Sequence, residues 1–187
     1  MTYEPVSYWK QQGKDYYKNF VYTPQFALQE TELLNYLDTI EFKSVLELGC
    51  GFGRITRLIS RNFPLIKKYC AIDVSQDQIK VAREICPSNI TFWCNDVESY
   101  HAKQQYDLVI AVELLMHIKP DKIYQIVQKM IAWSKKHVIN VDYYEENPIE
   151  LEEHNFCHDY PEIYNFDSKN IKIGNQAIFH LERTDMP

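Results

Sequence analysis

Short apolar runs alternate with helix-like segments along much of the 187-residue chain, and this alternation restricts its possible folds more than any other feature. The runs are Val45 to Leu48, Tyr69 to Asp73, Ile90 to Cys94, Leu108 to Val112 and His137 to Val141. Strands that are apolar along their whole length belong to parallel sheets covered on both faces, because each crossover needs a helix to return the chain. We therefore expect an α/β fold with a doubly wound, mostly parallel sheet and helices on both faces.

The segments between these runs carry helix and turn signals. Thr23-Pro24 is followed by an apolar stripe up to Ile40, and Ser75 with Gln78 matches a capping box. Too few residues separate the third and fourth strands for more than a short or irregular crossover helix. Near the end of the chain, Gly174-Asn175 separates two apolar stretches and predicts an antiparallel terminal hairpin. The sheet should therefore have seven strands.

Length and composition restrict the class of protein. Residues 1–187 fit a single domain, and no apolar run approaches the roughly 20 residues of a membrane span. Met1 to Lys10 lacks the features of a signal peptide, and the five cysteines are odd in number without a C-x-x-C pair, so we expect a cytoplasmic protein with free thiols. The net charge of −6 argues against a nucleic-acid partner, because phosphate binding usually needs a basic surplus.

The acidic side chains are concentrated in one segment. Residues 142–167 contain nine acids and no Lys or Arg, which leaves the rest of the chain at +3. These nine acids, eight of them in the acidic segment 143–168 that follows the fifth strand, should lie on the substrate side of the sheet and favour a neutral or cationic acceptor. The alternative is a merely solvated surface. The nine acids are Asp142, Glu145, Glu146, Glu150, Glu152, Glu153, Asp159, Glu162 and Asp167.

Three glycines follow the first strand at alternating positions, in a chain with only five glycines. A tight glycine turn at the end of a strand lets a ligand approach the backbone closely. A dinucleotide fingerprint would need a small residue where Arg54 stands, and a phosphate-binding P-loop would need Lys followed by Ser or Thr where Arg54-Ile55 stands. Both of these nucleotide-binding motifs are therefore excluded.

Glu47-x-Gly49-x-Gly51-x-Gly53 resembles the first motif of class I S-adenosylmethionine-dependent methyltransferases, and further motifs follow in order over residues 44–118. Asp73 occupies the position of the family's ribose-binding acid. Asn95-Asp96-Val97 occupies the adenine-binding position, and Glu113-Leu-Leu-Met-His117 resembles the fourth motif. The glycine pair that commonly precedes strand five is replaced by Trp133-Ser-Lys-Lys136, and the final hairpin has little room for a substrate-recognition insert.

The resemblance implies S-adenosyl-L-methionine as the cofactor. The residues expected to bind it are Glu47, Gly49, Cys50, Gly51, Gly53, Arg54, Asp73, Val74, Asp96, Val97, Glu113 and Tyr17. The N-terminal segment lies over the cofactor in this family, so residues 1–23, rich in aromatic rings, are expected to form a lid. Packing of these rings on the sheet edge is the alternative.

Methyl transfer is an in-line displacement that depends mainly on the alignment of donor and acceptor. A general base is needed only if the acceptor keeps its proton near neutral pH. His117, His154 and His158 are the candidates, because imidazole titrates in this range, and each has a structural role as its alternative.

The stretch EEHNFCHDY contains possible metal ligands, but Pro161 argues against a helix at Tyr160, so His154 and His158 need not share a face. The E-x-x-E-H signature of metal-dependent RNA-end ribose methyltransferases is absent, and no metal is expected. The amino-methylation signature N/D-P-P-Y/F is also absent after strand four.

We therefore expect an enzyme that methylates an oxygen or nitrogen atom of a small molecule or a protein side chain. An inactive cofactor-binding interaction subunit and an RNA-end ribose methyltransferase remain the alternatives. The oligomeric state cannot be read from the sequence.

Overall fold

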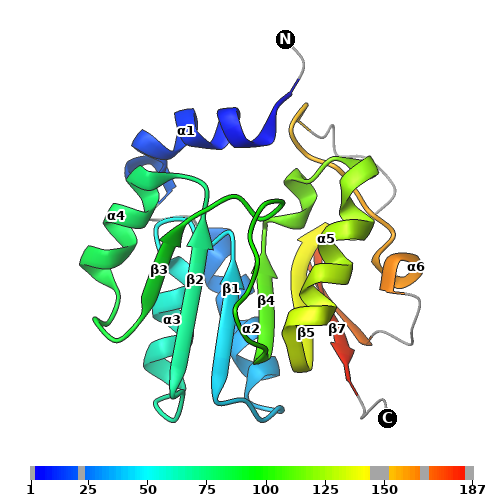
Figure 1. The fold of residues 1–187 in the computed structure, drawn as a ribbon. Coiled ribbons are helices and arrows are strands. Elements are labelled where there is room, and N and C mark those ends of the chain that lie inside the picture. Colours follow the sequence, from blue (N-terminus) through cyan, green and yellow to red (C-terminus); the bar gives the residue numbers. More distant parts are fainter. Residues whose placement is uncertain (1–2, 21–23, 144–151, 165–168, 184–187) are drawn as a thin grey trace.

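The computed structural model describes residues 3–20, 24–143, 152–164 and 169–183 of the chain. A central sheet is flanked by helices on both faces, and α1 lies across its upper edge (Figure 1). The strands are β1 (Ser44–Leu48), β2 (Lys68–Asp73), β3 (Thr91–Cys94), β4 (Tyr106–Val112), β5 (Ser134–Tyr143), β6 (Lys169–Ile173) and β7 (Gln176–Glu182). The helices are α1 (Pro5–Phe20), α2 (Pro24–Leu37), α3 (Arg54–Asn62), α4 (Gln76–Ile85), α5 (Pro120–Trp133) and α6 (Tyr160–Tyr164), with a short 3-10 helix, η1 (Leu115–His117).

The seven-stranded sheet has the order β3-β2-β1-β4-β5-β7-β6. The first five strands pair in parallel, whereas β7 runs antiparallel to both β5 and β6. The predicted doubly wound sheet with an antiparallel terminal hairpin is therefore confirmed. The strand order reverses between β1 and β4, and in open α/β sheets this is where a crevice opens beyond the carboxyl ends of the strands.

The two faces of the sheet are both buried, as the uniformly apolar strands require. Neighbouring residues of β1 point to opposite sides: Val45 packs with Leu33 and Ile59, whereas Leu46 packs with Val109 and Met130. All six of these side chains have no exposed surface. The sheet therefore provides a rigid base for the loops at its carboxyl edge.

Two local features differ from the sequence-based expectation, and a third agrees with it. Residues 5–20 form the regular helix α1, although only an aromatic lid was expected there. A helix, α6, also begins at Tyr160 despite Pro161. That expectation was wrong because proline is tolerated in a first helical turn, where the backbone N–H has no partner within the helix. The crossover between β3 and β4 contains no helix, in line with the prediction of a short or irregular connection.

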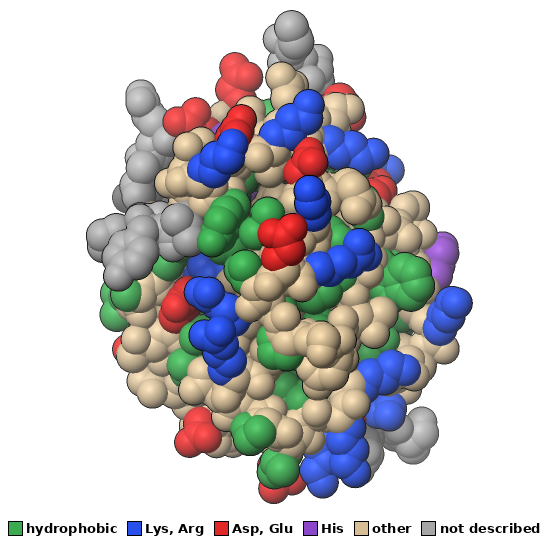
Figure 2. All heavy atoms as spheres, turned by 90° about the vertical axis from the view of Figure 1, so that its left-hand side faces the viewer, with side chains coloured by type: hydrophobic (Ala, Val, Ile, Leu, Met, Phe, Trp, Pro, Cys, Tyr) green, Lys and Arg blue, Asp and Glu red, His purple; other side chains and the backbone are tan. Residues whose placement is uncertain are grey.

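No helix in the described part of the chain is both long and apolar enough to span a bilayer. The face formed by α4 and the β3 edge carries many Lys and Arg side chains among its acids (Figure 2). The net acidity of the chain is therefore not gathered on this face.

Candidate active site

A cavity of about 700 Å³ lies at the carboxyl edge of the sheet. It is bordered by the glycine loop after β1, by the loops after β2, β3 and β4, by the end of β5 and by α1, which crosses above them (Figure 1). Its volume falls within the range of small-molecule and cofactor sites. The described residues thus form a pocket at the place where the reversal in strand order predicts that a ligand binds.

The glycine loop passes close to two neighbouring segments. Gly49 and Gly51 have positive φ angles of 67° and 53°, which side chains rarely adopt. A Cβ atom on Gly49 would lie 2.8 Å from Leu114 Cδ1, and one on Gly51 would lie 2.9 Å from Gln78 Oε1. Glycine is therefore required here for two reasons. The backbone conformation disfavours a side chain, and the loop after β4 and helix α4 leave no room for one.

The carboxylate of Asp73 is fixed at the end of β2. Its Oδ2 accepts a hydrogen bond of 2.8 Å from the backbone N–H of Gly51, and its Oδ1 accepts one of 2.8 Å from Ser75. Burial raises its pKa, and these backbone hydrogen bonds oppose the rise. Asp96 follows β3, where its Oδ1 accepts from the backbone N–H of Glu98 at 3.1 Å. Both acids line the cavity in preset orientations.

Glu47 lies beneath the glycine loop and is 2% exposed. Its Oε2 accepts hydrogen bonds from the hydroxyls of Thr56, at 2.6 Å, and Tyr69, at 2.7 Å. Burial raises the pKa of Glu47 to about 7, although both hydroxyls and nearby Arg54 lower it. This carboxyl group joins β1 to α3 and β2 and so supports the loop.

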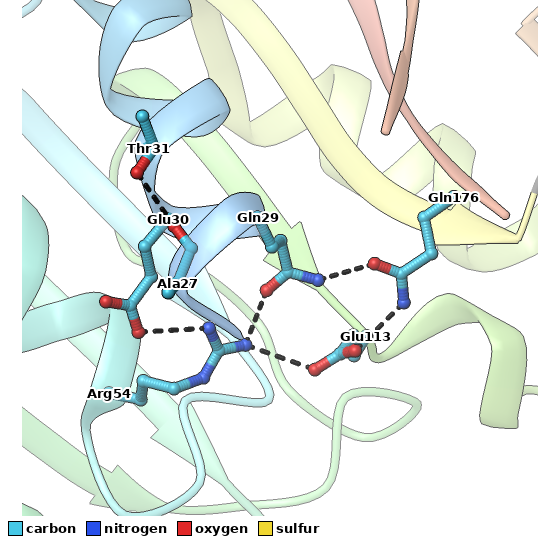
Figure 3. Close-up of polar contacts among 7 residues, drawn as sticks. All are labelled: Ala27, Gln29, Glu30, Thr31, Arg54, Glu113 and Gln176. Carbon is cyan, nitrogen blue, oxygen red and sulfur yellow. Dashed lines mark hydrogen bonds and ion pairs between the residues drawn. The ribbon is translucent and has the colours of Figure 1, made fainter. Parts of the chain in front are cut away.

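A polar network joins four elements beside the cavity (Figure 3). The Nη2 atom of Arg54 lies 3.1 Å from Glu113 Oε2 and donates to Gln29 Oε1 at 2.7 Å. Gln176 Nε2 donates to Glu113 Oε1 at 2.9 Å. Arg54 Nη1 also pairs with Glu30 at 3.3 Å. The guanidinium of Arg54 is thus held by residues of α2 and by Glu113 of the loop after β4. Gln176 of β7 holds the carboxylate of Glu113.

Glu113 has a φ angle of 54° and is the only residue other than glycine with a positive φ in the described chain. Such a conformation costs on the order of 1–3 kcal/mol and is retained only where the surroundings enforce it. Here the backbone N–H of Glu113 donates to Val141 at 2.8 Å, and its carboxylate is held by Arg54 and Gln176. The turn directs this acid toward the cavity, which it lines.

The three candidate histidines differ in their surroundings. The Nδ1 atom of His117 donates to the backbone oxygen of His154 at 3.0 Å, and burial lowers the pKa of His117 to about 4. His154 lines the cavity with a pKa also lowered by burial. His158 is buried, and its Nε2 donates to the carbonyls of Leu115 and Ile118, so it anchors η1 and does not line the cavity.

Helix α1 is attached at both ends of the cavity. The hydroxyl of Tyr3 donates to the backbone oxygen of His117 at 3.1 Å, and the rings of Trp9 and His117 lie 4.5 Å apart. On the other side, Gly13 lies so close to α4 that a Cβ atom there would be 1.9 Å from Ser75 Oγ. The helix therefore crosses the pocket from η1 to α4.

The acids of the predicted substrate-side segment are dispersed. Asp142 is fully buried, where its Oδ1 accepts from the backbone N–H of Met116 and its Oδ2 from Asn140. The expectation that it faces substrate was wrong, because its carboxylate holds η1 in place. Glu152 lines the cavity, and Glu153, Asp159 and Glu162 are exposed. Four of the acids, Glu145, Glu146, Glu150 and Asp167, lie outside the described residues.

Most of the predicted site residues meet around this cavity. Those lining it are Glu47, Gly49, Cys50, Gly51, Arg54, Asp73, Val74, Asp96, Val97, Glu113, His117 and His154. Gly53, Tyr17 and His158 do not line it; Tyr17 packs its ring against Phe52, and the neighbouring Tyr16 faces the cavity instead. Within the ranges described, no three His, Cys, Asp or Glu side chains are grouped as a metal site would require.

The sequence reasoning missed several residues that line the cavity. Helical spacing could have revealed Pro5, Trp9, Gln12, Tyr16 and Phe20, which recur every three or four residues and all face the pocket. Gln78 was interpreted only as part of a helix cap. Its lining position depends on the approach of α4 to the glycine loop, which no local pattern predicts.

The strand order and the glycine loop define the class I methyltransferase fold. A family profile described as a methyltransferase domain matches residues 45–137. A complex of DhpI with S-adenosylhomocysteine has the same fold, with a TM-score of 0.74, 17% identity and coverage of 96% of this chain and 94% of that one. Magnesium protoporphyrin IX methyltransferase from Synechocystis PCC 6803 gives a TM-score of 0.75 and 13% identity, and the match covers 96% of this chain and 98% of that one.

Two curated relatives show sequence similarity. Malonyl-[acyl-carrier protein] O-methyltransferase of Priestia megaterium is 33% identical over 84 residues, which cover 43% of this chain and 30% of the relative. Phosphoethanolamine N-methyltransferase 1 of Triticum aestivum is 29% identical over 140 residues, which cover 69% of this chain and 28% of the relative. The match thus spans less than a third of either relative. Residues 45–137 thus form a methyltransferase domain, and the chain has the fold of the class I S-adenosylmethionine-dependent methyltransferases, whose cofactor is S-adenosyl-L-methionine.

Proposed function

We propose that this chain transfers a methyl group from S-adenosylmethionine to an amine, either of a small molecule or of a protein side chain. The observation that carries this proposal is the one-sided charge of the cavity. The described residues that line it include the acids Glu47, Asp73, Asp96, Glu113 and Glu152, and Arg54 is the only Lys or Arg among them. An amine that arrives as its cation is favoured in such a field, and it must release its proton to water before its lone pair can attack the methyl group.

The residues at the β1, β2 and β3 ends fit the cofactor. Asp73 is preset to accept from ribose hydroxyls, and Asp96 with Val97 would hold the adenine ring. The glycine loop lets the cofactor approach the backbone, because its glycines leave no side chain in the way. When bound, the cofactor supplies a methyl group already activated by the positive sulfur.

The acceptor would lie between η1, α1 and the loop after β4. Arg54 is already paired with Glu30 and Glu113, so it offers little to a carboxylate or phosphate. The two relatives named above are named for malonyl-[acyl-carrier protein] and for phosphoethanolamine, and the described cavity offers no other Lys or Arg for an anionic group. The rings of Tyr8 and Trp9 can contact a cationic amine through their faces.

The surroundings of His117 favour a role in positioning the acceptor over a role in removing a proton. A pKa of about 4 leaves its imidazole neutral and weakly basic at pH 7. It forms a fixed wall of the cavity, because its ring packs at a tilt against Trp9 and it is hydrogen-bonded to the backbone of His154. We infer that α1 closes the cavity as a lid and excludes water, because it is attached on both sides of the opening.

Label transfer tests the proposal. The protein is incubated with methyl-labelled S-adenosylmethionine and a cell extract, and the products are sorted by ultrafiltration, cation exchange, and protease and nuclease treatment. We expect label that resists base and is retained by cation exchange, in either the small-molecule or the protein fraction. Base-labile methyl esters or nuclease-sensitive label would contradict the amine assignment. Binding of cofactor without any transfer would favour a non-catalytic subunit.

A further inference from the structure

Gln78 occupies a junction between three parts of the cavity. It lies in the first turn of α4, where its backbone N–H donates to Ser75 Oγ at 3.4 Å. Its Oε1 is 2.9 Å from the position that a Cβ atom on Gly51 would take. A Cβ atom on Gly13 of α1 would lie 3.3 Å from Gln78 Cγ. The side chain therefore touches both the glycine loop and the lid helix.

The carbonyl oxygen of this side chain has no hydrogen-bond partner. Gln78 is only 4% exposed, it lines the cavity, and its Oε1 is a buried acceptor without a donor. A buried polar atom left unpartnered costs about 1–3 kcal/mol, so such groups in native proteins usually have a reason. An acceptor that faces a ligand cavity acquires its partner when a ligand with a donor arrives.

The surroundings of Gln78 indicate which donor this is. Gly51, beside its Oε1, donates its N–H to Asp73, and Ser75, the cap of its helix, donates its N–H to the other oxygen of that carboxylate. Gln78 and Asp73 therefore approach the same peptide of the glycine loop. Asp96 follows a different strand, and Glu113 lies on the other side of β1. The ribose position that Asp73 marks is thus the nearest part of a bound cofactor.

We propose that Gln78 Oε1 accepts a hydrogen bond from a ribose hydroxyl of bound S-adenosylmethionine, as a second ribose contact beside Asp73. The inference rests on the proposed function, since it needs the cofactor in this cavity. A neutral amide adds an acceptor without adding negative charge next to Asp73. Because Gly13 packs over the same turn, the lid covers this contact directly.

Calorimetric titration with S-adenosylhomocysteine and with its 2′-deoxy and 3′-deoxy analogues tests this contact. Gln78→Met keeps the length of the side chain but removes the acceptor. Gln76→Met makes the same change at an exposed position of the same helix and serves as the control. We expect Gln78→Met to bind S-adenosylhomocysteine roughly 5- to 20-fold more weakly than wild type, as the loss of one hydrogen bond implies. The control should bind like wild type.

The deoxy analogues separate a hydroxyl contact from an effect on the lid. Gln78→Met and wild type should bind one deoxy analogue equally, because the hydroxyl that Gln78 contacts is missing there. The ligand-free Gln78→Met protein should unfold at a temperature no lower than wild type, since an unpartnered acceptor has been removed. Equal affinity of both proteins for S-adenosylhomocysteine, or an equal loss for all three ligands, would overturn the contact. A wild-type protein that binds none of them would overturn the proposed function as well.

Discussion

The guanidinium of Arg54 lies 3.1 Å from the carboxylate of Glu113, so the first residue of α3 is paired with the residue that follows β4. Side-chain exposures of 13% and 18% mean that water screens this pair only in part. The pair spans the point at which the strand order reverses and fixes an acid whose backbone is strained. It therefore helps to keep the two walls of the cavity together.

A double-mutant cycle measures this relationship. We expect Arg54→Gln and Glu113→Gln to be coupled by about 1–2 kcal/mol in the free energy of unfolding, because the residues are in direct contact and partly buried. The control is the exposed pair Lys18 and Asp15, with side-chain exposures of 75% and 67%. Its coupling in Lys18→Gln and Asp15→Asn should be at most a few tenths of a kcal/mol. Equal coupling in both cycles would mean that the Arg54 pair has no special structural role.

Gly13→Ala tests the docking of the lid. A methyl group at this position would overlap Ser75 Oγ, so α1 must move away from α4. Hydrogen exchange of residues 5–20 should become faster, while exchange in β1 and β4 stays unchanged, because the core does not depend on this contact. Lys14→Ala, at the neighbouring exposed position, provides the control. Unaltered exchange of α1 in Gly13→Ala would show that the lid does not need this contact.

Glu47→Gln should change how stability depends on pH. Burial raises the pKa of Glu47 from an ordinary 4.5 to about 7, so the folded protein binds the proton more tightly than the unfolded chain. This contribution is fully present below about pH 4.5 and is lost as the pH rises through about 7. The amide carries no charge, and its oxygen can still accept from Thr56 and Tyr69.

Denaturant titrations of the two proteins give the comparison. We expect Glu47→Gln to gain about 2–3 kcal/mol relative to wild type between pH 4.5 and pH 8, which corresponds to the shift in pKa. Glu84→Gln, at an exposed position of α4, should show no such gain. A gain for Glu47→Gln that does not grow with pH would refute the raised pKa.

The pH dependence of the reaction tests the role of His117. A residue with a pKa of about 4 stays neutral through the neutral range, so the profile of kcat/KM should contain no inflection from His117 between about pH 5.5 and 8. His117→Gln should therefore lower the rate by a similar factor at every pH in this range. An inflection near pH 6.5 that disappears in His117→Gln would instead make His117 the general base.

Much of the fold could be predicted from the sequence. Strands whose consecutive residues are all apolar, such as Val45 and Leu46, must lie in a sheet that is covered on both faces. The residues at strand ends, such as Asp73 and Asp96, could be placed by the same logic. Local reasoning failed where packing between distant segments decides. Asp142 is part of an acidic stretch in the sequence, yet its hydrogen bond to Met116 places it in the core. Gln78 is a site residue only because α4 approaches Gly51.

Cofactor binding in this cavity is the central claim, and calorimetric titration with S-adenosylhomocysteine tests it most directly. We predict saturable binding at one site in wild type, a loss of at least roughly tenfold in Asp73→Ala, and no loss in Asp38→Ala, which changes an exposed acid remote from the cavity lining. Equal affinity in all three proteins, or no binding to the wild type, would contradict the account.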